Sequence, residues 1–174
     1  MKPCTGCGLE KSLAEFHKHS ITKDGLCHIC KDCSRERGRS FSMTPSGQYT
    51  SIKSRQKFYK KNQSYRYKPV LISREDFIKW YEAEPKFCVY CGLPEVQMSE
   101  VDDFYNSKGR MLSVDAKDNN LGYVVGNLAL ACHRCNGIKS DFFSYEEMLE
   151  IGGMFVRPKW YIEYVSDLGE NSEN

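Results

Sequence analysis

Residues 112–139 read LSVDAKDNNLGYVVGNLALACHRCNGIK and decide the fold. Their pattern predicts four local elements in chain order: a strand at 112–115, a turn at 119–122, a second strand at 127–132 and a helix at 134–139. A C-x-x-C pair, Cys132 and Cys135, lies where the second strand meets the helix. The stretch therefore predicts a strand–turn–strand–helix unit with metal ligands at its last junction.

Nine cysteines are many for 174 residues, and most of them occur in C-x-x-C pairs. Without a secretory signal, such spacing favours metal binding over disulfides. A structural zinc ion takes four tetrahedral ligands, and one C-x-x-C turn supplies two of them. We expect two structural zinc ions, each held by four cysteines: Cys4, Cys7, Cys30 and Cys33 in one site, and Cys88, Cys91, Cys132 and Cys135 in the other.

This simplest pairing leaves Cys27 over. The residues alone also allow Cys27 and Cys30 to be the second pair of the first site, or His28 to replace a cysteine. Each zinc ion would contribute on the order of 10 kcal/mol to folding. A chain with only 40% hydrophobic residues has a small apolar core and needs such a contribution.

The charge of the chain is unevenly distributed. Residues 1–70 hold 15 Lys and Arg against 5 Asp and Glu, and residues 71–174 hold 10 against 18. Aromatic residues are interleaved with the cations between 35 and 68, where Glu36 is the only acid. This segment is typical of a surface that follows a phosphate backbone. The cations that we expect to contact DNA are Arg35, Arg37, Arg39, Lys53, Arg55, Lys57, Lys60 and Lys61.

Three further helices are expected around these motifs. Ser46 and Gly47 indicate a break, after which residues 49–61 predict a helix lined with cations. Ser73 is placed as the N-cap of a helix over residues 74–82. The aromatic side chains at 77, 80 and 81 would form the apolar face of that helix. A last helix is predicted from residue 144 to 150.

Residues 112–139 resemble the HNH family of ββα-metal nucleases, in the branch whose fold is held by zinc. The resemblance covers residues 86–143 closely and the first cysteine unit loosely, where the family pattern favours Cys30 with Cys33. It implies an α+β fold: a small zinc-stabilised ββα-metal domain preceded by a zinc ribbon and a basic helical linker. We therefore expect an N-terminal zinc-binding unit at 1–38, a basic DNA-contacting segment at 39–72, the nuclease domain at 73–160 and an acidic tail at 161–174.

The resemblance also assigns roles to single residues. Asp115 matches the acid that binds the catalytic metal, and Asn136 matches the helix position that completes that site. Asn127 matches the loop asparagine that fixes the backbone between the strands. A hard cation such as Mg²⁺ or Mn²⁺ prefers oxygen ligands and stabilises charge on a phosphoryl group. The implied activity is metal-dependent hydrolysis of phosphodiester bonds in duplex DNA.

The chain departs from the family at one position. Ala116 stands where the family usually has the histidine general base, and alanine cannot accept a proton. His133 and Tyr90 are the leading replacements, and Tyr123 and Asp118 are the others. A non-catalytic zinc protein that binds DNA, or a zinc-stabilised protein-interaction module, is the alternative if none of them acts.

Partners and location follow from the same features. A homodimer would let one site per subunit cut both strands. No apolar run approaches the roughly 18–20 residues that a membrane span needs, and the N-terminus lacks a secretory signal. We expect a bacterial or phage-encoded protein of the cytoplasm.

Overall fold

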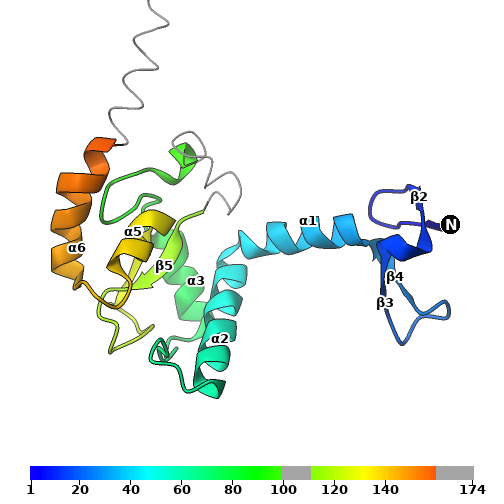
Figure 1. Cartoon of the computed structure of the whole chain (residues 1–174), viewed down its shortest axis with the longest axis horizontal. Helices are drawn as coiled ribbons and strands as arrows, with labels where there is room; N and C mark the ends of the chain where they lie inside the picture. Colours follow the sequence, from blue (N-terminus) through cyan, green and yellow to red (C-terminus); the bar gives the residue numbers. More distant parts are fainter. Residues whose placement is uncertain (99–110, 160–174) are drawn as a thin grey trace, which may run out of the picture. The chain divides into compact units, whose positions relative to one another are not determined.

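The computed structural model describes residues 1–98 and 111–159, and the expected acidic tail lies outside these ranges. The chain forms two compact units, Met1–Thr44 and Pro45–Asn174 (Figure 1). Both contain helices and short strands, so the predicted mixed α and β fold is confirmed. Within the described ranges, no helix is long and apolar enough to cross a membrane.

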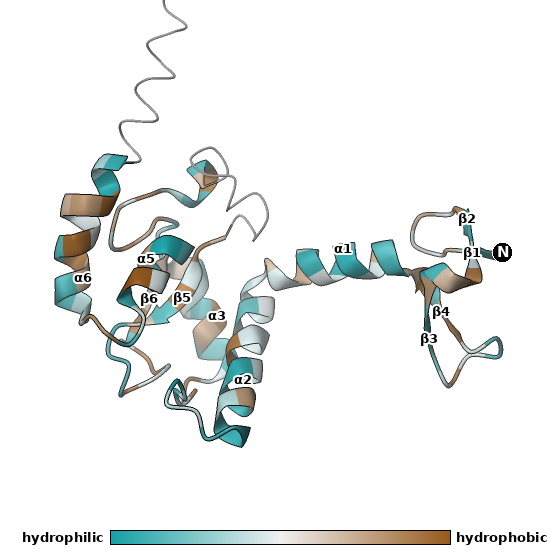
Figure 2. Ribbon diagram, in the orientation of Figure 1, coloured by the Kyte–Doolittle hydropathy of each residue, from teal (hydrophilic) through white to brown (hydrophobic). Residues whose placement is uncertain are grey.

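The first unit consists of two small hairpins followed by a helix. Strands β1 (Lys2–Pro3) and β2 (Glu10–Lys11) pair antiparallel, as do β3 (Phe16–Lys18) and β4 (Leu26–Cys30), with the short helix η1 (Leu13–Glu15) between the hairpins. Helix α1 (Lys31–Ser42) follows and is almost entirely hydrophilic (Figure 2). The buried cluster is small, with Cys4, Phe16 and Cys30 at its centre. This unit therefore depends on something other than apolar burial for its stability.

The second unit is built around a buried hairpin. Its elements are α2 (Pro45–Lys61), α3 (Arg74–Ala83), η2 (Glu95–Gln97), β5 (Ser113–Ala116), β6 (Leu128–Ala131), α5 (His133–Lys139), α6 (Tyr145–Ile151) and the π-helical turn η3 (Gly152–Val156). In Figure 1, β5 and α5 lie between α6 on one side and α2 with α3 on the other. The order β5, β6, α5 is the strand–strand–helix order predicted from the sequence.

The β5–β6 hairpin forms the centre of this unit. Its antiparallel register pairs Val114 with Leu130 and Asp115 with Ala129. All four residues of β6 are buried, which explains why their sequence is apolar throughout instead of alternating. Asp115 is thus carried on a strand whose backbone has few alternative positions.

Helices α2 and α3 pack through aromatic side chains. The rings of Tyr49 and Phe77 lie 5.4 Å apart, and Phe77 is fully buried. Ser73 caps α3 as predicted, because its hydroxyl accepts the Asp76 N–H at 3.0 Å.

Two boundaries differ from the sequence expectation. Helix α2 begins at Pro45 and includes Gly47, because proline is well suited to the first helical position, where no N–H partner is needed. Helix α1 runs past residue 38, and the basic α2 packs on α3 within one compact unit. The structural division at residues 44 and 45 therefore differs from the expected boundaries at 38 and 72.

Candidate functional site

The first unit brings four cysteines together. The sulfur atoms of Cys4, Cys7, Cys30 and Cys33 lie within 4.8 Å of one another, and Cys27 and His28 are not in the group. Backbone N–H groups of Cys30 and Gly6 donate to the Cys4 sulfur at 3.2 and 3.3 Å. The pKa of Cys4 is lowered to about 6. The hydrogen bond from the Cys30 N–H is the largest cause of this shift, and it outweighs burial, which acts in the opposite direction. A thiolate stabilised in this way is the form that binds zinc.

The second unit contains a fully buried cluster of the same kind, formed by Cys88, Cys91, Cys132 and Cys135. The Cys91 and Cys132 sulfurs are 3.9 Å apart, and those of Cys4 and Cys33 in the first unit are 3.8 Å apart. With Zn–S bonds of about 2.3 Å, a tetrahedral site requires sulfurs roughly 3.8 Å apart. Both clusters therefore have the sulfur spacing of a structural zinc site in which cysteines fill all four ligand positions.

The second cluster joins the hairpin to its helix. The Cys132 sulfur accepts the Cys135 N–H at 3.4 Å and so caps α5. The Val89 N–H, inside the other cysteine turn, donates to the Leu130 carbonyl of β6 at 2.9 Å. One cysteine cluster thus fixes β6, α5 and the turn at residues 88–91 together.

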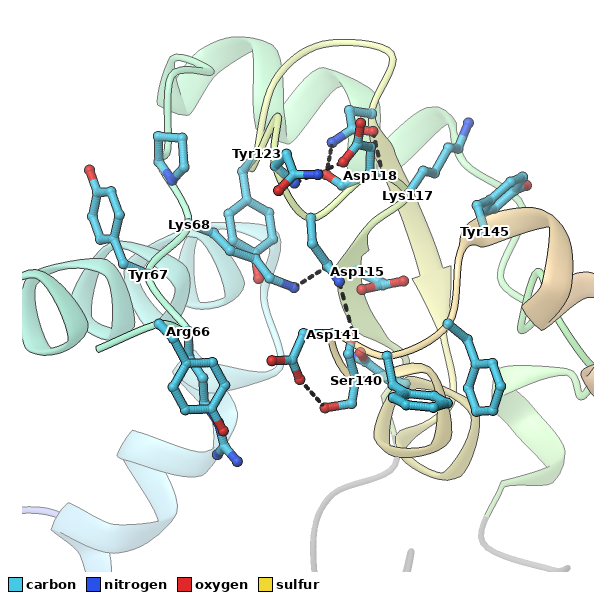
Figure 3. A pocket seen from close by; sticks show the side chains of 18 of the residues that line it. Arg66, Tyr67, Lys68, Asp115, Lys117, Asp118, Tyr123, Ser140, Asp141 and Tyr145 are labelled. Carbon is cyan, nitrogen blue, oxygen red and sulfur yellow. Dashed lines mark hydrogen bonds between the residues drawn. The ribbon is translucent and has the colours of Figure 1, made fainter. Parts of the chain in front are cut away.

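A large pocket of about 1,460 Å³ opens in the second unit beside this junction. Asp115, from β5, lines it (Figure 3), and so does Asn136, from α5. The residues that sequence analysis placed in a shared metal site therefore face one cavity. The rest of its wall is largely polar and aromatic, and comes from α2, the segment at 65–69, the loop at 117–120 and the segment at 140–146.

Asp115 is held at its position by two side chains. The Tyr90 hydroxyl donates to Oδ2 of Asp115 at 2.6 Å, and the Lys139 Nζ lies 3.3 Å from the same oxygen. Asp115 is 2% exposed and Lys139 is fully buried. A buried carboxylate needs such a partner, because an isolated charge is costly in a poorly solvated environment.

Asn136 is oriented through β5. Its Nδ2 donates to the Ser113 hydroxyl at 2.8 Å, and that hydroxyl donates to the Ala131 carbonyl at 2.9 Å. Since the amide nitrogen is engaged with Ser113, the side-chain oxygen of Asn136 is the atom suited to a cation. Asp115 and Asn136 together offer the oxygen donors that Mg²⁺ or Mn²⁺ prefers.

Asn127 closes the loop between the two strands. Its Nδ2 donates to the carbonyls of Asp118 and Gly122 at 2.8 and 2.7 Å, and its Oδ1 accepts the Asp118 N–H at 2.9 Å. Three backbone groups are satisfied by one buried amide, so this loop has a defined conformation. The side chain contributes geometry at the hairpin end and offers no free group to a substrate.

The candidates for the general base are placed differently from one another. Burial, and then the charge of Asp115, raise the pKa of Tyr90 well above its usual range, so this phenol acts as a hydrogen-bond donor to Asp115. His133 is the first residue of α5, and the described residues that line the pocket include no histidine. Asp118 and Tyr123 do line it. Ala116 is fully buried.

No protein-family model and no curated protein matches this chain. A solved structure does. It is described as that of the rare-cutting HNH restriction endonuclease PacI, with 26% sequence identity and a TM-score of 0.47. The match covers 92% of this chain and 96% of the chain of PacI.

The cations expected to contact DNA fall on two helices. Arg35, Arg37 and Arg39 are exposed on α1 of the first unit. Lys53, Arg55, Lys57, Lys60 and Lys61 are on α2, and only Arg55 of these lines the pocket.

Three pocket cations were absent from the expected DNA-contacting residues: Arg66, Lys68 and Lys117. Arg66 and Lys68 lie at the end of the basic segment, so their place in that segment could have identified them as DNA-contacting residues. Lys117 follows Asp115 by two residues, and its ammonium lies 5.4 Å from the centre of the Tyr145 ring. The pocket therefore carries more positive charge than the motif alone indicated.

Proposed function

We propose that this chain is a metal-dependent endonuclease of the HNH type that hydrolyses phosphodiester bonds in duplex DNA. The observation that carries the proposal is the common pocket of Asp115 and Asn136, which come from the strand and the helix of one cysteine-clamped unit. The cations on its wall favour a polyanionic substrate. The likeness of the sequence to HNH nucleases agrees with this chemistry.

Asp115 and the side-chain oxygen of Asn136 would hold Mg²⁺ or Mn²⁺, which supplies Lewis-acid stabilisation of the phosphoryl charge. Tyr90 and Lys139 keep the Asp115 carboxylate at the pocket wall. Asp118 lines the same cavity and would accept a proton from water, directly or through a second water, whereas burial raises the pKa of Tyr123 and makes its phenol a poor proton acceptor. The structural zinc ions would fix this arrangement without taking part in the chemistry.

Duplex DNA would be bound through the backbone phosphates. The basic faces of α1 and α2 supply cations, which position a protein on DNA without reading the sequence. A homodimer would allow two such sites to act on the two strands.

A second candidate function is DNA binding without cleavage. It is favoured by two specific features: Ala116 replaces the usual base, and the buried Lys139 lies 3.3 Å from the carboxylate that would bind the metal. In that case the pocket would be a remnant of an active site, and DNA affinity would not depend on Asp115.

Cleavage of supercoiled plasmid in Mg²⁺ or Mn²⁺ separates the two. We expect nicking or linearisation by the wild-type protein, reduced on the order of 100- to 1,000-fold by Asp115→Asn, which keeps the size of the side chain. Glu150→Gln removes an exposed carboxylate from α6 and is the matched control. Wild-type protein that binds DNA tightly and leaves it uncut in both metals would establish the non-catalytic alternative.

A further inference from the structure

Lys68 projects into the pocket from a segment distant in sequence from the HNH motif. Its Nζ donates to Oδ1 of Asn119 at 2.5 Å, in the loop that follows β5. In Figure 3 the Lys68 side chain extends across the pocket toward Asp115. The Nδ2 of Asn119 donates to the Ser140 carbonyl at 3.0 Å, which fixes the orientation of the amide. Lys68 is therefore held in a defined position beside the candidate metal ligand.

A second lysine near Asn119 shows by contrast what Lys68 is suited to do. Lys139 is fully buried, and its Nζ contacts the Ala116 carbonyl at 2.9 Å, Asp115 at 3.3 Å and Asn119 at 3.5 Å. All three donors of that ammonium are directed at the protein. Lys139 therefore acts within the fold and cannot reach a ligand.

The ammonium of Lys68 has more N–H donors than acceptors around it. An ammonium carries three N–H groups, and Asn119 is the only hydrogen-bond acceptor of Lys68 among the residues that the structure describes. Within those residues Lys68 also forms no salt bridge, although its side chain is half-buried and lines the pocket. A partly desolvated cation without an anionic partner is a binding position for an anion.

The surroundings support an anionic ligand at this point. Burial lowers the pKa of Lys68, and the nearby carboxylate of Asp115 opposes that effect. A bound phosphate would stabilise the charged form of the lysine and replace the hydration that it lacks. Arg66 and Arg55 line the same pocket and extend the positive surface away from Lys68.

We propose that Lys68 binds a non-bridging oxygen of the phosphate that occupies the pocket, and that Asn119 positions it for this contact. This inference rests on the proposed function, in which that phosphate is the scissile one. Lys68 is then a catalytic residue that the HNH motif does not contain, because it neutralises charge on the phosphoryl group. Asn119 is a positioning residue that acts through Lys68.

The first test measures DNA affinity of the zinc-loaded protein as a function of KCl concentration, without added Mg²⁺ or Mn²⁺ so that no cleavage occurs. Each phosphate contact contributes about 0.9 to the slope of log K against log salt. Lys68→Met should therefore reduce the slope by about one, whereas Lys68→Arg should retain it. Lys79→Met removes a cation from the exposed face of α3 and is the control with an unchanged slope. An unchanged slope in Lys68→Met and in Lys68→Gln overturns the proposal.

The second test measures single-turnover cleavage at saturating protein. We expect Lys68→Met to slow cleavage by about 100-fold while DNA affinity falls less than tenfold, and Lys68→Arg to recover part of the rate. Asn119→Ala should slow cleavage, because Lys68 would be less well positioned. It should retain most of the salt slope of DNA binding, because the charge of Lys68 is still present. Cleavage by Lys68→Met at the wild-type rate contradicts the catalytic role.

The two proposals fail in different ways. If the wild-type protein does not cut DNA, the salt dependence still decides whether Lys68 contacts a phosphate. If the protein cuts DNA and Lys68→Met changes neither rate nor slope, only the assignment of Lys68 is lost. Zinc content and thermal unfolding of each variant show whether the fold is retained.

Discussion

In the second unit, a few side chains fix the position of the Asp115 carboxylate and of the backbone loop that lines the pocket. Asp115 is fixed by Tyr90 and Lys139, and the loop after β5 is fixed by Asn127. These contacts are buried or partly buried, and a buried polar group without a partner costs about 1–3 kcal/mol. At this scale, residues that never touch a substrate can therefore control the geometry of those that do.

Asn127→Ala should destabilise the second unit by about 2–3 kcal/mol, because two backbone carbonyls and one N–H lose a buried partner. Asn127→Asp should be no better, since a carboxylate would face the two carbonyls. Urea unfolding in zinc-buffered solution measures the change. Asn120→Ala is the control, because Asn120 is exposed and only its backbone N–H is hydrogen-bonded among the described residues. Equal stability of the Asn127→Ala and Asn120→Ala proteins would contradict this role.

At the scale of elements, the cysteine turns and helix ends fit together. Cys30 caps α1 and Cys132 caps α5, so in each unit the cysteine that begins the second pair also begins a helix. Helix α6 begins at a complete capping box between Ser144 and Glu147. Its continuation, η3, packs against the cysteine turn that contains Tyr90.

Gly152 is the point of that close packing, and Gly153 provides a matched control. A Cβ on Gly152 would lie 2.5 Å from the Tyr90 carbonyl oxygen, whereas one on Gly153 would meet nothing within 4 Å. We expect Gly152→Ala to destabilise the protein by about 1–3 kcal/mol through overpacking. Gly153→Ala should be neutral or stabilising by up to about 1 kcal/mol.

The Gly152 substitution should also slow DNA cleavage, because the displaced Tyr90 would no longer hold Asp115. Thermal unfolding and plasmid cleavage of both alanine variants check the two effects. If Gly152→Ala and Gly153→Ala behave alike, η3 does not support the site in this way.

The elements near the cysteines were predictable because local signals coincide there. The apolar run at 127–132, the C-x-x-C pair and the turn residues all indicated β5, β6 and α5, and the cysteine groups are those expected. The start of α2 was missed because Gly47 was interpreted as a break, although glycine is tolerated in a first helical turn.

The contacts that complete the pocket could not be read from the sequence. Tyr90 was a candidate base, and only the tertiary structure shows that its buried hydroxyl donates to Asp115. Lys68 was visible as one cation among many, and its contact with Asn119 joins segments that no local pattern connects. Motif spacing identifies residues that share an element, whereas the approach of separate segments depends on how the whole unit packs.

At the scale of the whole molecule, the chain consists of two units that each contain a buried cluster and a four-cysteine group. The core of the first unit is much smaller than that of the second. A structural zinc ion would supply on the order of 10 kcal/mol to each, which is comparable to the entire stability of a small domain. The folding of each unit should therefore follow its own metal.

Cys7→Ser and Cys91→Ser test this separation. Each variant should lose one of two bound zinc ions, measured by metal analysis of the purified protein. Two-dimensional amide NMR should show loss of dispersed signals from the first unit alone in Cys7→Ser, and from the second unit alone in Cys91→Ser. Collapse of both units in either variant would show that they depend on each other.

The order of side chains along α5 has a consequence for how this chain can change. Cys135 faces the cysteine cluster, Asn136 lines the pocket and Lys139 reaches Asp115, all within seven residues of one helix. An α-helix turns by about 100° per residue. Inserting or deleting a single amino acid after Cys135 would keep the cluster and rotate Asn136 and Lys139 off their partners together. We therefore expect an insertion or deletion directly after Cys135 to abolish activity, even at positions where a substitution is tolerated.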